Sequence, residues 1–313
     1  MSTLSLTHAP SVLPLYVRAA APLIPGASLL PFVPGGGGEI PEIDLRLEGV
    51  NADSADVAAY AKVCGFALRD HLPPTYPHVL AFPLHMAVMA DGSFPFGAIG
   101  LVHLENRIEQ YRPIGVGEEM AVRVHPTKLQ PHPKGQTFSL LTEVSVAGEP
   151  AWTSESSMLR RGKPADGPKS HPEDDKSAHR PGVGGDIPAS AEWRLGSDLG
   201  RRYASVSGDR NPIHMHSLTA KPLGFPGAIA HGMWTKARCL AALESRLPDA
   251  FGVDVRFRKP ILLPGRVEFA SAEEGGDVLF AVRDAKRQTP HLDGRVRPLG
   301  DKSKAKTGRK KAQ

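Results

Sequence analysis

The chain has 313 residues, of which 41% are hydrophobic and 23% charged, a balance typical of a globular protein and not of a disordered one. Its two cysteines, Cys64 and Cys239, lie far apart, which excludes a disulfide framework and favours a reduced, cytoplasmic setting. The formal net charge of +5 equals the excess carried by residues 301–313 alone. The rest of the chain is therefore formally neutral, and we expect no specific nucleic-acid partner.

The first 40 residues predict an irregular arm. Its most apolar stretch, residues 21–38, is interrupted by four prolines and is too short to cross a membrane. It also lacks the basic start and compact apolar run of a signal peptide. We therefore expect no membrane insertion and a cytoplasmic location.

A segment rich in proline, glycine and charge, residues 162–190, reads as a linker. It divides the chain into similar halves, at 41–161 and 191–290. Residues 291–313 after them are predicted to form a basic, disordered tail. Such a tail can touch nucleic acid, anionic lipid or an acidic carrier protein, but it more often stays solvated.

The two halves share a sequence pattern. YAKVCG at 60–65 parallels YASVSG at 203–208, and each run predicts a helix that ends at a glycine. A mostly apolar helix from about residue 231 to 245 follows in the second half, and alternating strand patterns come after it. Each half thus predicts an α+β unit in which an antiparallel sheet wraps around a central helix.

The stretch GDRNPIH at 208–214 follows the second of these glycines. Asp209, Asn211 and His214 then lie in a loop that Pro212 stiffens. A carboxylate and an imidazole held there can bind one water and move its protons. The same residues also suit a polar turn in which Asp209 caps its own backbone.

A second pair, His231-Gly232, opens the apolar helix. A helix start presents unpaired N–H groups, and a glycine lets a substrate oxygen approach them closely. Gly232 is therefore a candidate for polarising a thioester carbonyl, with His231 beside it as a substrate contact. A glycine needed only for packing is the alternative.

Together, YASVSGDRNPIH, FPGAIAHGM and VRFRKPILLPGRV resemble the MaoC-like family of (R)-specific enoyl-CoA hydratases and (3R)-hydroxyacyl-thioester dehydratases. The two-copy layout resembles the double hot dog members of that family. The resemblance implies that Asp209 and His214 form the catalytic pair and that the Gly232 N–H binds the thioester carbonyl. Asn211 would order the loop or contact the substrate.

The first half resembles a degenerate copy. Aligned without gaps, Phe66 falls opposite Asp209 and His71 opposite His214. A separate match of His85 with His231 puts Met86 opposite Gly232. The resemblance implies that this half leaves room for the acyl chain, lined by residues such as Phe82 and Met86. Ordinary core packing is the alternative for each of them.

Arg258, in the basic run 256–259, could meet the phosphates of coenzyme A or of a phosphopantetheine arm, or it could belong to a solvated strand edge. We expect no metal and no cofactor, because the histidines show no ligand spacing and only water and a proton move. The partner would be an acyl-CoA or acyl carrier protein substrate, and the layout allows a homodimer.

The predicted reaction is the reversible hydration of trans-2-enoyl thioesters, or the dehydration of (3R)-3-hydroxyacyl thioesters, in fatty acid metabolism. A thioesterase on the same scaffold is one alternative. A non-catalytic acyl-binding module is another.

Overall fold

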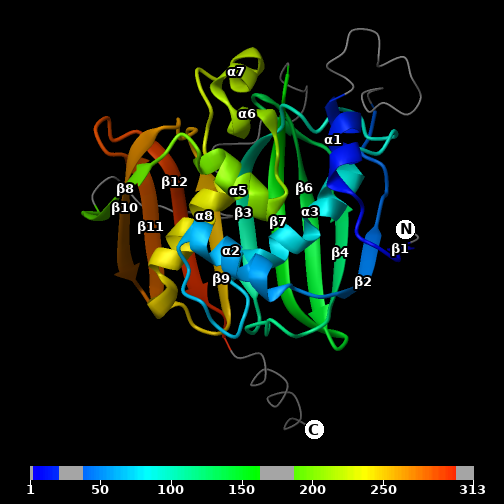
Figure 1. Ribbon diagram of the computed structural model, residues 1–313, viewed down its shortest axis with the longest axis horizontal. Helices are drawn as coiled ribbons and strands as arrows, with labels where there is room; N and C mark the ends of the chain where they lie inside the picture. The colour runs from blue at the N-terminus through cyan, green and yellow to red at the C-terminus, as the bar shows by residue number, and fades with distance from the viewer. Residues whose placement is uncertain (1–2, 21–37, 163–186, 301–313) are drawn as a thin grey trace, which may run out of the picture.

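The computed structural model describes residues 3–20, 38–162 and 187–300. Within these ranges the strands join into one sheet, and the longer helices lie against one face of it (Figure 1). Two elements precede the first half, β1 (Leu4–Leu6) and α1 (Val12–Ala20). The arm expected to be irregular therefore holds a helix. Its strand β1 lies at the edge of the sheet and pairs in parallel with residues 45–47 of the next strand.

The first half supplies one side of the sheet and two helices. Its elements are β2 (Leu45–Val50), α2 (Ser54–Cys64), α3 (Tyr76–Met89), β3 (Val102–Gln110), β4 (Met120–Pro126), β5 (Gln130–His132), β6 (Gly135–Val146) and β7 (Glu149–Arg161). Strand β4 shows why the pattern folds this way. Met120, Val122 and Val124 are buried and alternate with the partly exposed Ala121, Arg123 and His125, which places one face of the strand against the helices.

The second half repeats this order with additional short helices. Its elements are β8 (Ala189–Leu195), α5 (Leu199–Ser207), α6 (Pro212–Met215), α7 (Ser217–Ala220), the 3-10 helix η3 (Lys221–Leu223), α8 (Gly232–Ala242), the 3-10 helix η4 (Glu244–Arg246), β9 (Phe251–Phe257), β10 (Gly265–Glu274), β11 (Asp277–Asp284) and β12 (Pro290–Pro298). The apolar helix expected near 231–245 is α8, and it ends three residues earlier.

The strand order shows an internal two-fold repeat. From its outer strand inward, the first half runs β2-β4-β6-β7-β3 and the second runs β8-β10-β11-β12-β9. The halves meet where β3 and β9 pair antiparallel. Each half is a hot dog unit with a central helix, α3 or α8, in front of its sheet (Figure 1). The double hot dog prediction is confirmed.

The helix ends predicted from the repeat are also confirmed. Gly65 follows α2 with φ 84°, and Gly208 follows α5 with φ 76°. This left-handed conformation is strained for residues with a side chain. The two helices lie side by side, and Tyr60 and Tyr203 approach with ring centroids 6.1 Å apart.

Two predicted domain boundaries need correction. Residues 290–298 form β12, which pairs with β9 and β11, so the second unit extends past 290 and the tail cannot begin at 291. The strand forms because Leu292 and Val296 fill the core beneath the sheet. At the linker, residues 163–186 lie outside the described part, and 189–190 already belong to β8. Residues 301–313 also lie outside it.

The gap-free alignment of the halves is wrong beyond the helix ends. In the first half, Leu72 N donates to Ile114 O, and in the second, Ala230 N donates to Ile261 O. Isolated bridges at His71 and Ile229 extend the same pairing. His71 therefore corresponds to Ile229 and not to His214. Met86 lies deep within α3, so it does not correspond to Gly232 at the start of α8.

Candidate active site

The GDRNPIH segment forms a short helix and not a plain loop. Asn211 is the N-cap of α6, and its side chain accepts a hydrogen bond from Ile213 N at 3.4 Å. Pro212 occupies the first helical position, where its missing N–H costs nothing. His214 is the third residue of α6, so this helix fixes the direction of its side chain. Asn211 therefore orders the segment, which is one of the two roles expected for it. It also lines the cavity described below.

Asp209 receives two hydrogen bonds and has a histidine next to its second carboxylate oxygen. Its Oδ1 accepts hydrogen bonds from the Tyr16 hydroxyl at 2.9 Å and from Asn211 N at 3.1 Å. Its Oδ2 lies 3.8 Å from Nε2 of His231. Burial acts to raise the pKa of this carboxyl, but His231, His214 and the hydrogen bonds outweigh it and hold the pKa below its usual value.

His214 is buried and has a defined tautomer. Its Nδ1 lies 2.8 Å from the carbonyl oxygen of Ile229, and a carbonyl can only accept, so Nδ1 carries the proton. Nε2 is then an acceptor. Burial lowers the pKa of His214 below its usual value, although the Asp209 carboxylate and the Ile229 carbonyl act in the opposite direction. The imidazole is therefore neutral at pH 7.

His231 supports both members of this pair. Its ring stacks on that of His214, with centroids 3.6 Å apart and an interplanar angle of 26°. Its Nε2 donates to the backbone oxygen of Asp209 at 3.0 Å. Burial, followed by the neighbouring His214, lowers its pKa to about 3. His231 was expected to contact substrate. It lines the cavity, and it also fixes the Asp209 backbone.

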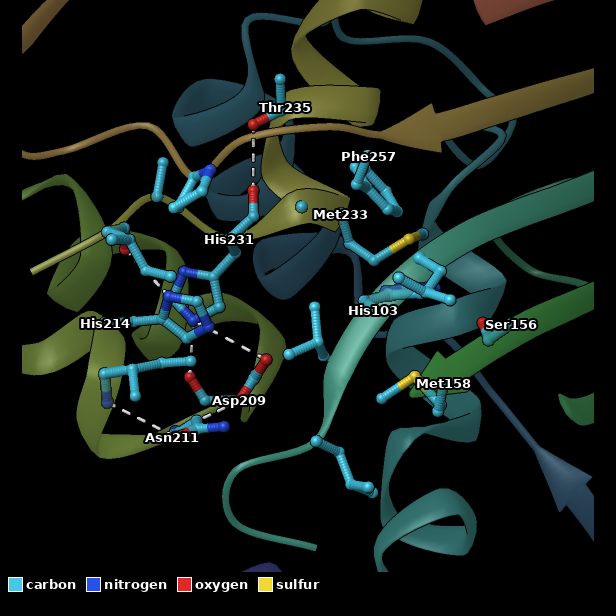
Figure 2. A pocket seen from close by; sticks show the side chains of 18 of the residues that line it. His103, Ser156, Met158, Asp209, Asn211, His214, His231, Met233, Thr235 and Phe257 are labelled. Carbon is cyan, nitrogen blue, oxygen red and sulfur yellow. Dashed lines mark hydrogen bonds and ion pairs between the residues drawn. The ribbon is translucent and has the colours of Figure 1, made fainter. Parts of the chain in front are cut away.

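Gly232 is the first residue of α8, as predicted. The first N–H groups of a helix have no partner within the helix. A Cβ at this position would lie 3.0 to 3.2 Å from the ring of Phe257, so a side chain here would crowd that ring. Figure 2 shows the start of α8 beside His214 and Asp209, with Phe257 and Met233 next to it.

These groups border one cavity of about 230 Å³ between the two units. Phe82 lines it, as expected. Met86 does not, because it is buried in the core around α3. The predicted position is thus right for Phe82 and wrong for Met86, where the alternative of ordinary core packing holds. That this space takes the acyl chain stays a prediction. Met89, one turn after His85 on the same helix, is a further lining residue from that half.

Basic side chains stand along the edge of the cavity formed by β7, β9 and β12. Arg258 lines it and pairs with Asp293, with Nε 2.6 Å from Oδ2. Arg161, Lys259 and His291 line it as well. That these groups meet the phosphates of the substrate stays a prediction.

Tyr16 is the principal site residue that the sequence did not reveal. It comes from α1, and its hydroxyl both donates to Asp209 and accepts from Arg210 N at 2.8 Å. Burial, then the charge of Asp209, raises its pKa far above the ordinary value, so the hydroxyl stays protonated and can donate. The sequence signal that could have revealed it is the apolar helical run Val12–Ala20, which indicates that α1 packs against the rest of the protein.

The site also has the donor types of a metal centre. Asp209, His214 and His231 each offer one ligand atom, and these atoms lie within 4.8 Å of one another. Two of the ring nitrogens, His214 Nδ1 and His231 Nε2, already contact backbone carbonyls. An ion could bind these two nitrogens only if the hydrogen bonds broke. Otherwise only the other ring nitrogen of each histidine would be available to it. The expectation of no metal stays a prediction.

The comparisons with known proteins show the family of the chain. A family model described as "MaoC like domain" matches residues 183–294. The 3-hydroxyacyl-thioester dehydratase X of Mycobacterium tuberculosis is 40% identical over 290 residues, which cover 93% of this chain and 99% of the relative. The chain belongs to the MaoC-like dehydratase family. The hydro-lyase class expected from the sequence is thereby confirmed.

Solved structures support the same assignment. The crystal structure of HtdX from Mycobacterium tuberculosis is 38% identical and matches with a TM-score of 0.72, covering 82% of this chain and 100% of the other. A MaoC-like dehydratase from Phytophthora capsici, 20% identical, shares the fold with a TM-score of 0.66 over 84% of this chain and 97% of its own. No helix in the described ranges is long and apolar enough to cross a membrane.

Proposed function

We propose that this dehydratase hydrates trans-2-enoyl thioesters reversibly, and that it forms and consumes (3R)-3-hydroxyacyl thioesters. The observation that carries the proposal is the convergence of Asp209, His214 and the start of α8 on one cavity. A carboxylate, a neutral imidazole and free helix N–H groups are what water addition to a conjugated thioester requires. The acyl chain would be carried by coenzyme A or by an acyl carrier protein.

In the hydration direction, the thioester carbonyl accepts a hydrogen bond from Gly232 N–H. The water lies between Asp209 and His214 and attacks C3 of the substrate. His214 Nε2 takes one proton of this water and returns it to C2, while the Asp209 carboxylate holds the remaining O–H. One C–O bond and one C–H bond form, and the π bond and one O–H bond break. Dehydration is the same path reversed.

Two other activities fit the same fold. In a thioesterase, the water would attack the carbonyl carbon and release a free thiol. In a binding module, the acyl thioester would stay intact. One reaction mixture separates all three, because enoyl absorbance and free thiol can be followed together.

We expect the purified protein to remove enoyl absorbance from a chain-length series of trans-2-enoyl-CoAs without releasing thiol. In reverse, (3R)-3-hydroxyacyl-CoA should produce enoyl absorbance, and its (3S) isomer, the matched control, should not. Thiol released in step with substrate loss would make the protein a thioesterase. Binding with neither change would make it a binding module. Either result would overturn the proposal.

A further inference from the structure

The cavity has a polar wall at the end opposite the catalytic pair. His78 of α3, His103 of β3 and Ser156 of β7 line it, among apolar neighbours such as Met158. Figure 2 shows His103, Ser156 and Met158 grouped across the cavity from Asp209 and His214. A simple alkyl chain would need none of these polar groups, and burying them without partners costs free energy.

Ser156 has a hydroxyl proton that is free to form a hydrogen bond with a ligand. Its side chain is buried, with 3% of the residue exposed, and its Oγ accepts a hydrogen bond from Asn106 Nδ2 at 3.0 Å. A hydroxyl has one proton to donate, and this contact leaves that proton unused. Ser156 is therefore a donor available to the cavity.

The amide that orients Ser156 is itself fixed. Lys236 of α8 is fully buried, and its Nζ donates to Asn106 Oδ1 at 2.5 Å, to Asn106 O at 3.1 Å and to Val253 O at 3.3 Å. Burial lowers the pKa of Lys236 well below its usual value, but the three acceptors around Nζ match the three donors of the ammonium form and stabilise it. With Oδ1 occupied by Lys236, the Asn106 amide must turn its NH₂ group to Ser156 and to Ser154.

Two histidines of the wall keep ring nitrogens without partners. Among the described residues, His103 Nε2 and His78 Nδ1 are buried and make no hydrogen bond. The third histidine of the group, His85, is satisfied by Thr142 Oγ1 at 2.8 Å. Burial lowers the pKa of His78 to about 4 and that of His103 to about 3. Both rings are neutral at pH 7.

We propose that Ser156 and His103 form a subsite for an acyl chain that carries a neutral oxygen group, a hydroxyl or a ketone. Ser156 donates to that oxygen, and His103 Nε2 accepts from it when it is a hydroxyl. A carboxylate is disfavoured here, because among the described residues of this wall Lys236 is already engaged and both histidines are neutral. The inference rests on the proposed function, since it assumes that acyl thioesters enter this cavity.

Saturated acyl-CoAs test the subsite without turnover. For chains of several lengths, the dissociation constant of the plain acyl-CoA is compared, by calorimetry, with those of its ω-hydroxy and (ω−1)-oxo forms. At the length that reaches the wall, we expect both oxygenated chains to bind about three- to tenfold more tightly, as one net hydrogen bond allows.

Two variants separate the two kinds of oxygen. Ser156→Ala removes the donor, so it should abolish the preference for hydroxyl and ketone alike. His103→Leu removes the acceptor, so it should reduce the preference for the hydroxyl and leave that for the ketone. His71→Leu is the matched control, because His71 lies outside the cavity, and it should bind every chain as the wild type does.

No preference for oxygenated chains at any length, or a preference unchanged in Ser156→Ala, would overturn the subsite. If His103→Leu fails to fold, as judged by circular dichroism, Ser156→Ala decides alone. Failure of the proposed function appears differently, since acyl-CoAs would bind with the expected preference while enoyl-CoAs were not hydrated.

Discussion

Single residues set the protonation states on which the site depends. Asp209 has a pKa below its usual value, and His214 also has a lowered pKa. At neutral pH the pair is therefore a carboxylate beside a neutral imidazole, and both can accept a proton. Tyr16 contributes to this state, because its hydroxyl donates to Asp209 Oδ1.

We predict that Tyr16→Phe moves the acid limb of the pH profile of kcat/KM to higher pH. Without the hydroxyl, the Asp209 carboxylate loses a donor and its pKa rises, so the active form is lost at a higher pH as the solution is acidified. kcat/KM at neutral pH should fall about tenfold, because a hydrogen bond to a charged group is lost. Initial rates from about pH 3 to 8, a range that includes the lowered pKa of Asp209, measure both effects.

The control is Tyr111→Phe, which removes a tyrosine contact with a different carboxylate, Glu109, outside the cavity. It should leave the profile in place. If Tyr16 only supported packing, Tyr16→Phe would lower activity at every pH alike, and an unmoved acid limb would therefore contradict this role.

Elements position the site through one close contact between helices. A Cβ on Gly200 of α5 would lie 1.9 Å from the backbone oxygen of His214 on α6. Glycine at this position lets the two helices approach, and backbone cannot move aside as a flexible side chain would. The direction of the His214 ring thus depends on a residue that touches no substrate.

We predict that Gly200→Ala destabilises the protein by about 1–3 kcal/mol, the usual cost of overpacking, and lowers kcat by at least about tenfold by displacing His214. Urea unfolding and initial rates measure the two effects. Gly117→Ala is the control, since a Cβ there would meet nothing within 4 Å. Wild-type activity in Gly200→Ala would show that the α5–α6 contact does not position His214.

For helices and strands, the sequence was informative at residues that the backbone conformation or the packing itself requires. Gly65 and Gly208 could be predicted as helix ends, and Gly232 as a helix start, because each has a conformational or steric reason to be glycine. The Tyr16–Asp209 contact could not be predicted, because it joins positions 193 residues apart and α1 carries no motif. Strand β12 was missed because it follows the part of the repeat that could be aligned.

The whole molecule is a duplicated fold whose halves differ in the segment that connects their two main helices. From the glycine that ends one helix to the cap of the next, the first half uses 11 residues, Gly65 to Thr75, and the second uses 24, Gly208 to His231. The longer connection in the second half contains α6, α7 and η3. Matching the sequence patterns could recover the two units but could not place His71 or Met86, because the halves differ in length where the catalytic residues lie.

One active site in the second unit is the central claim, and paired variants test it most directly. Asp209→Asn and His214→Ala should each lower the initial rate of trans-2-enoyl-CoA hydration by at least about 100-fold, as expected for lost proton transfer, with the fold intact by circular dichroism. Asp70→Asn and His71→Leu, on the shorter connection that follows Gly65 in the first unit, should retain the wild-type rate. Near-wild-type hydration in either second-unit variant, or an equal loss in the first-unit pair, would contradict the claim.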